Sequence, residues 1–193
     1  AVVLGKHNLL AAHLSRRVAE ILGNALAYPP NPYAPAGDPI AKTGHMRFAG
    51  TVSMSAETLA AVSRDIAISA LAVGFTHVIM LGDHGETQEI IKEVAGSVDA
   101  EWRSRGGRVI FIPVYDEGEG RMREILTARN VPNNRMTPID DAAEMMALDS
   151  SNRWIRAEHL PQDIAAVASG ELGQQFIDGK VEVAVARIRE LVQ

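Results

Sequence analysis

Two short apolar runs enclose a longer stretch with helical spacing, and this order constrains the fold more than any other feature of the sequence. The runs from Val78 to Leu81 and from Val109 to Val114 have the length and composition of buried strands. Residues 86–105, which lie between them, are predicted to form a helix. A strand, a helix and a second strand make a βαβ unit, in which the strands lie parallel. The sequence therefore predicts an α/β fold with a mostly parallel sheet.

Helical spacing of apolar residues recurs on both sides of this unit. Asn8 to Leu22 is predicted to be a helix, with Asn8 as a plausible N-cap. A second helix is predicted to open at Ser55 and to run to about Val73. Later helices are predicted over residues 121–128, 140–148 and 171–192. Ala25 to Tyr28 is read as a short buried strand, followed by a long loop from Pro29 to Gly50.

Length, charge and composition limit the class of protein. A chain of 193 residues, 47% of them hydrophobic, can bury a sizeable core, so residues 1–193 are expected to form a single domain. A net charge of −5 without a basic stripe argues against nucleic acid as a partner. No apolar run approaches the roughly 18 residues that cross a bilayer, so a soluble protein without membrane contact is expected. The sequence contains no cysteine, which excludes thiolate metal ligands.

A histidine and several acids follow the two predicted strands. Asp83, His84 and Glu86 come after the first strand, and Asp116 and Glu117 come after the second. The carboxyl ends of parallel strands border the ligand crevice of an open α/β sheet. His84 and Glu86 are two residues apart and can point to one side and share a metal ion, with zinc favoured and manganese as the alternative. A purely structural alternative stays open, in which Glu86 caps a helix and His84 hydrogen-bonds in a turn.

Two further histidines lie at candidate positions. His7 belongs to the segment GKHN, where it is either part of a site or a surface residue before a helix. His45 belongs to TGHMRFAGTVSMS, which is either a substrate-binding loop or a chain reversal with a solvated histidine. The motifs GxSxG, HExxH, Walker A and GxGxxG are all missing, so a serine hydrolase elbow and a nucleotide-binding loop are not indicated.

These segments, in this order, resemble the creatininase family, the creatinine amidohydrolases and their relatives. The resemblance covers about residues 4–114 and includes LGKHNLL near the beginning. Its most specific parts are the pattern HM-x-F-x-GT-x-S-x-S from His45 to Ser55 and the pattern G-x-H-x-E from Gly82 to Glu86.

The resemblance implies a three-layer α/β/α sandwich, a homo-oligomer that is often a hexamer, and two divalent metal ions at the carboxyl edge of the sheet. It also implies hydrolysis of the C–N bond of a small cyclic or linear amide by a metal-activated water. In the family pattern His84 and Glu86 match two metal ligands, and His7 occupies the position of an aspartate that bridges the two metals. The expected site has three sets of residues: the metal ligands His7, His84 and Glu86; the catalytic groups Asp83, Asp116 and Glu117; and the substrate-binding residues His45 and Tyr115.

The chain departs from the family pattern in three places. The motif E-x-H-G-x-H-L-P, expected just before Leu4, is not in the sequence, so the domain is expected to lack its N-terminal strand and first metal motif. The bridging aspartate is replaced by His7. The histidine and acids expected near Arg135, Met136 and Thr137 are replaced as well, which argues against creatinine itself as the substrate. Two hypotheses follow: a metal-dependent amidohydrolase, or a creatininase-like subunit that has lost catalysis and serves binding or assembly.

Overall fold

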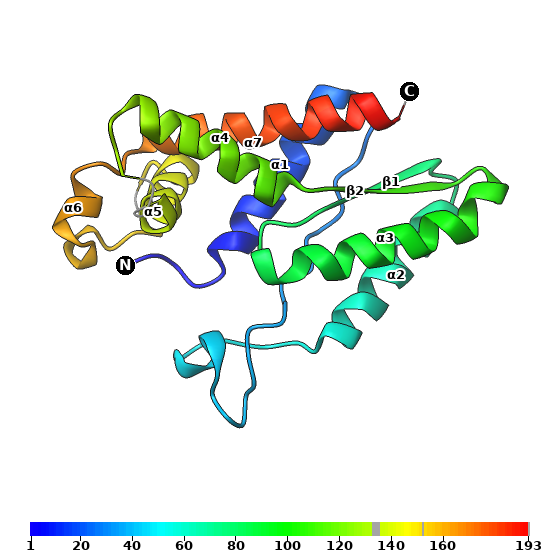
Figure 1. Ribbon diagram of the computed structural model, residues 1–193, viewed down its shortest axis with the longest axis horizontal. Helices are drawn as coiled ribbons and strands as arrows, with labels where there is room; N and C mark the ends of the chain where they lie inside the picture. The colour runs from blue at the N-terminus through cyan, green and yellow to red at the C-terminus, as the bar shows by residue number, and fades with distance from the viewer. Residues whose placement is uncertain (133–135, 152, 193) are drawn as a thin grey trace. The chain divides into compact units, whose positions relative to one another are not determined.

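The computed structural model describes residues 1–132, 136–151 and 153–192, which form helices and a parallel pair of strands (Figure 1). In chain order the elements are α1 (Lys6–Leu22), η1 (Gly44–Arg47), α2 (Ala56–Ala72), β1 (His77–Leu81), η2 (Gly85–Thr87), α3 (Gln88–Trp102), η3 (Arg103–Arg105), β2 (Arg108–Ile112), α4 (Val114–Ala128), α5 (Met136–Leu148), η5 (Ala157–His159), α6 (Gln162–Ala165) and α7 (Gly170–Leu191). The chain divides into two compact units. Unit 1 comprises Ala1–Pro30 and Val114–Ala186, and unit 2 comprises Asn31–Pro113 and Arg187–Gln193.

Unit 2 contains the predicted βαβ arrangement. β1 and β2 pair in parallel with a register that runs from His77 opposite Arg108 to Leu81 opposite Ile112. Helices α2 and α3 pack against each other and lie on the same side of the two strands (Figure 1). The core between these helices and the strands consists of Ala67, Leu71, Val94, Ala95, Val98 and Val109. The predicted parallel pairing is therefore confirmed.

Helix α2 begins and ends close to the residues predicted from the sequence. Ser55 is its N-cap, and its hydroxyl oxygen accepts a hydrogen bond from the Thr58 N–H at 3.1 Å. This bond satisfies one of the backbone donors that the first turn of a helix leaves without an intrahelical partner. The helix ends at Ala72, one residue before the predicted end.

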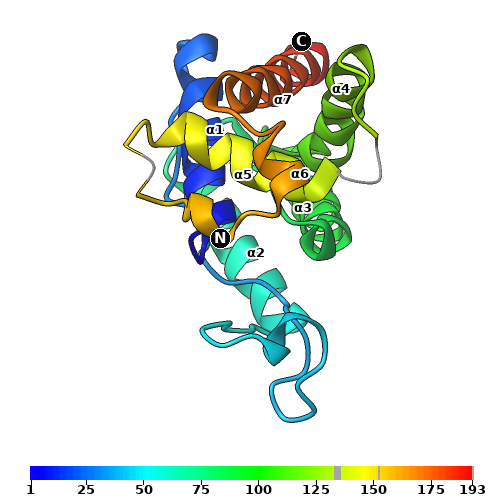
Figure 2. The same ribbon diagram turned by 90° about the vertical axis from the view of Figure 1, so that its left-hand side faces the viewer.

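The long loop before α2 is ordered by hydrogen bonds rather than by a core. Ser53 Oγ accepts from the Ala36 N–H at 3.0 Å and donates to the Gly37 carbonyl at 2.9 Å, while the His45 N–H donates to the Ala36 carbonyl at 2.8 Å. Figure 2 shows this loop extending beyond the N-terminal end of α2. The bonds bend the chain back on itself and place His45 in the short helix η1.

Unit 1 is helical, and α5 contacts α1, α4 and α6 within it (Figure 2). The N-terminal segment is held by an antiparallel bridge between Val2 and Ile155 and by a 2.9 Å hydrogen bond from the Val3 N–H to the Trp154 carbonyl. The apolar face predicted for the first helix is buried at Leu10, Leu14 and Val18.

Two local predictions in unit 1 are wrong. Ala25 to Tyr28 is not a strand, and 73% of Leu26 is exposed. Pro29 and Pro30 follow directly, and proline has no N–H to donate to a neighbouring strand. The first helix begins at Lys6 rather than after Asn8, because Gly5 takes the N-cap position and its carbonyl accepts from the Asn8 N–H at 2.9 Å.

Among the helices in the described part of the chain, none combines the length and apolar character that a membrane crossing requires.

Candidate functional site

The carboxyl end of β1 carries three of the predicted site residues. Asp83 is buried, and 7% of its surface is exposed. His84 has an extended backbone, with φ −144° and ψ 123°, and immediately precedes the 3₁₀ turn Gly85–Thr87. Glu86 lies in this turn and is exposed to solvent. The acids and the histidine thus lie at the junction of a strand and a helix, as predicted.

The backbone carbonyl of His84 is held by three donors. It accepts hydrogen bonds from the Thr87 N–H at 3.1 Å, from Thr87 Oγ1 at 2.7 Å and from Gln88 Nε2 at 2.8 Å. Thr87 and Gln88 are both buried, so water does not compete with these bonds. The junction that carries His84 and Glu86 is therefore fixed by side chains at the start of α3.

His45 lies beside His84, although 39 residues separate them in the sequence. The ring centroids are 6.3 Å apart and the ring planes meet at 62°. The His45 ring also lies 6.3 Å from the Phe48 ring, over which the Arg47 guanidinium is placed at 5.0 Å. The long loop therefore brings an exposed imidazole to the end of β1, and the role of this segment as a substrate-binding loop stays a prediction.

The other predicted site residues belong to unit 1, where two helices begin. His7 lies in the first turn of α1 and is half-buried. Tyr115, Asp116 and Glu117 lie in the first turn of α4, with Asp116 exposed and the other two half-buried. The prediction that this helix begins near Arg121 is wrong. Acidic side chains in a first turn interact favourably with the positive end of the helix dipole.

Gly118 explains why the beginning of α4 was missed. Two glycines in DEGEGR are typical of a turn, because glycine lowers helix propensity. In the structure Gly118 is buried, and a Cβ atom there would lie 2.8 Å from Cγ of Lys180 on α7. The glycine is thus required by close packing between two helices.

A buried group of charges in unit 1 was also missed by the sequence analysis. Lys180 Nζ and Glu144 Oε1 form an ion pair at 2.8 Å, with 4% and 3% of the two residues exposed. Lys6, which adjoins His7, forms an ion pair with Asp141. A signal was present in the sequence, since Lys180 and Glu144 interrupt apolar faces of predicted helices.

Asp140 lies next to these pairs and has an altered acidity. Its burial, followed by the negative charges of Asp141 and Glu144, raises its pKa to about 8, although Lys6 and Lys180 oppose the shift. Asp140 is therefore mostly protonated near pH 7.

Within the described ranges, no three histidine or acidic side chains lie close enough together to hold one metal ion. The roles predicted for His7, His84 and Glu86 as ligands stay predictions. Arg135, where the sequence departs from the family pattern, lies outside the described residues, and Met136 and Thr137 begin α5.

Comparison with known proteins gives the family. The model of the family described as "Creatininase: Creatinine amidohydrolase" matches residues 1–164. The chain belongs to the creatininase family. The matched range includes His7, His45, His84 and Glu117, and the resemblance seen in the sequence is confirmed.

Solved structures of creatininases share the fold of this creatininase-family chain. A manganese creatininase is 20% identical, with a TM-score of 0.76, and the match covers 98% of this chain and 84% of the other. A mutant creatininase complexed with creatine is 19% identical, with a TM-score of 0.76 and coverages of 98% and 85%. A mutant creatininase of the Zn-Zn type is 19% identical, with a TM-score of 0.76, and the match covers 98% of this chain and 84% of the other. The predicted α/β fold class is confirmed. A search of curated protein sequences found no match.

Proposed function

We propose that this creatininase-family chain is a metal-dependent amidohydrolase that cleaves the C–N bond of a small cyclic or linear amide. Membership of the family supports this proposal, because its model is that of a creatinine amidohydrolase. Solved creatininases of the same fold include manganese and Zn-Zn forms and a complex with creatine. Because the sequence identity to these creatininases is low, the amide that this chain hydrolyses depends on its own residues.

The observation that carries the proposal is the arrangement of His84 at the end of β1. Its backbone is fixed by Thr87 and Gln88, and the His45 ring lies 6.3 Å from its own ring. Imidazole nitrogen and carboxylate oxygen are ordinary ligands for zinc and also suit manganese. We assign His84 and Glu86 as metal ligands, with zinc as the first choice and manganese as the second. His7 remains the third ligand predicted from the sequence.

A bound divalent ion supplies two effects that amide hydrolysis needs, a water of lowered pKa and a polarised carbonyl. The chain supplies the proton transfers and the orientation of the substrate. Asp83, Asp116 and Glu117 are the acids proposed to take up or deliver protons. His45 and Tyr115 are proposed to hydrogen-bond the amide, because imidazole and phenol can each donate or accept.

The test combines metal content with hydrolysis by the untagged chain. Metal would be measured by mass spectrometry after incubation with Zn²⁺ or Mn²⁺ and desalting. Release of amine or ammonia, or ring opening, would be followed with creatinine, hydantoin, small lactams and linear amides. His84→Ala should lose bound metal and reduce turnover at least about 100-fold, because mutating even the residues that support metal ligands costs about 10- to 100-fold. His159→Ala, at an exposed histidine, is the matched control.

A parent chain that neither binds metal nor hydrolyses any of these amides would contradict the proposal. That result would favour the other hypothesis, a creatininase-like subunit for binding or assembly. The replacement of the bridging aspartate by His7 is the specific feature that supports this alternative.

We further propose that both units belong to one creatininase-like domain and that the chain forms a homo-oligomer, with a hexamer expected. The family model spans residues of both units. Large apolar side chains are exposed at Leu4, Leu26 and Ile40, by 69%, 73% and 92%. Exposed apolar surface is common at subunit interfaces. Light scattering that finds a monomer of 20.8 kDa at micromolar concentration would contradict the oligomer.

A further inference from the structure

Gln88 holds the segment between β1 and the proposed metal ligands. This residue begins α3 and only 5% of it is exposed. Its side-chain nitrogen donates to two backbone carbonyls, that of Gly82 at 3.2 Å and that of His84 at 2.8 Å. An amide nitrogen has two N–H groups, so both are used within one short segment of chain. The two acceptors also fix which way the amide faces, since its oxygen cannot donate.

Gly82 provides the space that this arrangement needs. A Cβ atom at position 82 would lie 2.9 Å from Gln88 Nε2 and 2.7 Å from Ile91 Cδ1. A larger residue at position 82 would therefore require the Gln88 amide and the Ile91 side chain to shift. The missing side chain of Gly82 therefore leaves the space that the Gln88 amide occupies.

Thr87 adds two bonds to the same carbonyl of His84, one from its N–H and one from its hydroxyl. The carbonyl of His84 is thus held by two adjacent residues, and that of Gly82 is held by Gln88. Since the His84 side chain leaves the backbone next to this carbonyl, its direction depends on these bonds.

The amide oxygen of Gln88 is buried and accepts no hydrogen bond from the part of the chain that the structure describes. A buried acceptor without a donor is unfavourable, so the Gln88 amide keeps this orientation although its oxygen gains no hydrogen bond. The opposite orientation would place the amide oxygen against the carbonyl oxygens of Gly82 and His84, so the two bonds from Nε2 decide how the amide faces.

We propose that Gln88 is a positioning residue that fixes the backbone from Gly82 to His84 and thereby sets the metal affinity of His84 and Glu86. The part that concerns metal rests on the proposed function. Residues that orient metal ligands through hydrogen bonds typically contribute about 10- to 100-fold to metal affinity.

The test uses the full chain with Gln88→Met, which keeps the length of the side chain and removes its donors. Zn²⁺ affinity would be measured by competition with a chelator, and circular dichroism would check the fold. Gln88→Met should bind Zn²⁺ at least about tenfold more weakly than the parent. Gln174→Met, at an exposed glutamine on α7, should bind as the parent does. An unchanged Zn²⁺ affinity in Gln88→Met would overturn the role in metal binding.

A second measurement needs no metal. Hydrogen exchange of the Thr87 amide, which donates to the His84 carbonyl, would be followed by NMR in the metal-free parent and in Gln88→Met. Exchange at least about tenfold faster in the variant supports the positioning role, since the amide is then released by local opening. Unchanged exchange overturns it. If the parent binds no Zn²⁺, the proposed function fails, whereas the exchange rates still decide whether Gln88 fixes this segment.

Thr87 provides a further pair of variants if Gln88→Met does not fold. Thr87→Val removes the hydroxyl without changing the shape of the side chain, and Thr87→Ser keeps the hydroxyl. Thr87→Val should weaken Zn²⁺ binding and speed up exchange near His84, while Thr87→Ser should restore both toward the parent values. Equal behaviour of the two variants would contradict control of His84 through its carbonyl.

Discussion

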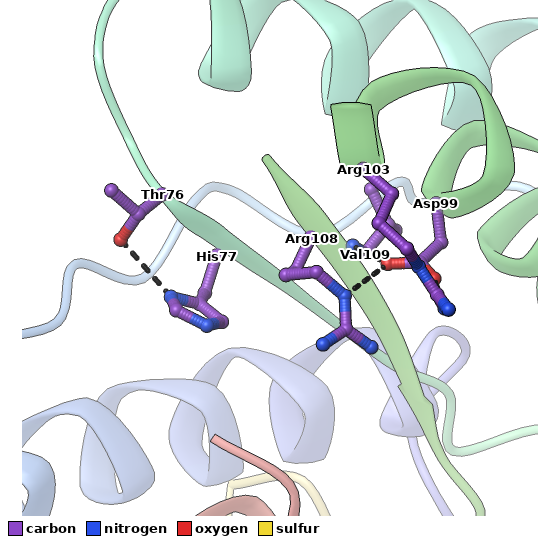
Figure 3. Close-up of polar contacts among 6 residues, drawn as sticks. All are labelled: Thr76, His77, Asp99, Arg103, Arg108 and Val109. Atoms are coloured by element: carbon purple, nitrogen blue, oxygen red, sulfur yellow. Dashed lines mark hydrogen bonds and ion pairs between the residues drawn. The ribbon is translucent and has the colours of Figure 1, made fainter. Parts of the chain in front are cut away.

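The Asp99 carboxylate accepts a hydrogen bond from Arg108 Nε at 2.7 Å and so ties the end of α3 to the beginning of β2 (Figure 3). The same oxygen accepts from the Val109 N–H at 3.0 Å, and the other oxygen is paired with Arg103. In a pair of strands, successive backbone N–H groups point alternately toward and away from the neighbouring strand. The Arg108 N–H donates toward β1, to the Thr76 carbonyl at 2.9 Å, so the Val109 N–H points away from β1. Asp99 thus satisfies a backbone donor at the outer edge of β2.

We predict that Asp99 makes the free energy of unfolding depend on pH. Burial by itself would raise the Asp99 pKa, but the bonds from Arg103, Arg108 and Val109 outweigh it and lower the pKa to about 2. A lowered pKa in the folded state stabilises the protein above pH 4, and this contribution is lost as the pH falls toward 2. Asp99→Asn should lower the free energy of unfolding at pH 7 by about 1–2 kcal/mol, since solvent partly screens the charges of the exposed Arg103 and the half-buried Arg108.

Urea unfolding between pH 2 and pH 7 would measure this effect. The curves of the parent and of Asp99→Asn should converge as the pH falls. Asp65→Asn, at an exposed acid on α2, is the control and should follow the parent. A constant difference between parent and Asp99→Asn across the whole range would contradict the prediction.

Asp140 should give stability the opposite dependence on pH. Burial and the charges of Asp141 and Glu144 raise its pKa to about 8, above its ordinary value of 3.8. The folded state therefore binds a proton that the unfolded state releases, and the free energy of unfolding falls as the pH rises from about 4 to 8. The slope from this group is at most about 1.4 kcal/mol per pH unit. Asp140→Asn should flatten the decline between pH 5 and pH 8, measured by urea unfolding, and parallel curves would reject this assignment.

Gly118 and Gly120 provide a matched pair of substitutions within α4. A methyl group at position 118 would lie 2.8 Å from Cγ of Lys180, whose ammonium is held by Glu144, so Gly118→Ala should cost about 1–3 kcal/mol. In the part of the chain that the structure describes, no atom beyond the neighbouring residues and the helix's own backbone lies within 4 Å of a Cβ at position 120, so Gly120→Ala should stabilise the helix by about 0.5–1 kcal/mol. Thermal unfolding of both variants tests this prediction. Equal shifts in the unfolding temperature would show that helix propensity alone determines the effect of the two substitutions.

The elements that could be predicted are those with a local signal. The apolar periodicity of α2 and its Ser55 cap lie within the segment itself, and β1 and β2 are short apolar runs. β2 ends at Ile112, two residues before the predicted end, because Pro113 follows and α4 begins at Val114. The false strand at Ala25 to Tyr28 shows the limit of such a signal. Its composition suits a strand, but a strand also needs a partner, and the sequence of the segment does not specify one.

The parts of the candidate site that could not be predicted depend on contacts between distant segments. The proximity of His45 to His84 requires the fold of the long loop, which is set by bonds such as those of Ser53 with Ala36 and Gly37. The role of Gln88 depends on the direction of one side chain at the first turn of α3. The motif G-x-H-x-E identified the ligands proposed for a metal, but it contains no information about the residues that hold them.

The last prediction concerns the number of metal ions per chain. A carboxylate can bridge two cations through its two oxygens, whereas a neutral imidazole has one lone pair and binds one cation. With His7 in the position of the family's bridging aspartate, we expect one tightly bound ion rather than two. The Zn²⁺ content of His7→Ala should then fall well below one ion per chain, whereas that of His7→Asp should rise toward two. Both contents would be measured by mass spectrometry after dialysis. His13→Ala, in the same helix, is the control. A metal content unchanged in His7→Ala would remove His7 from the ligand set and leave His84 and Glu86 as the proposed ligands.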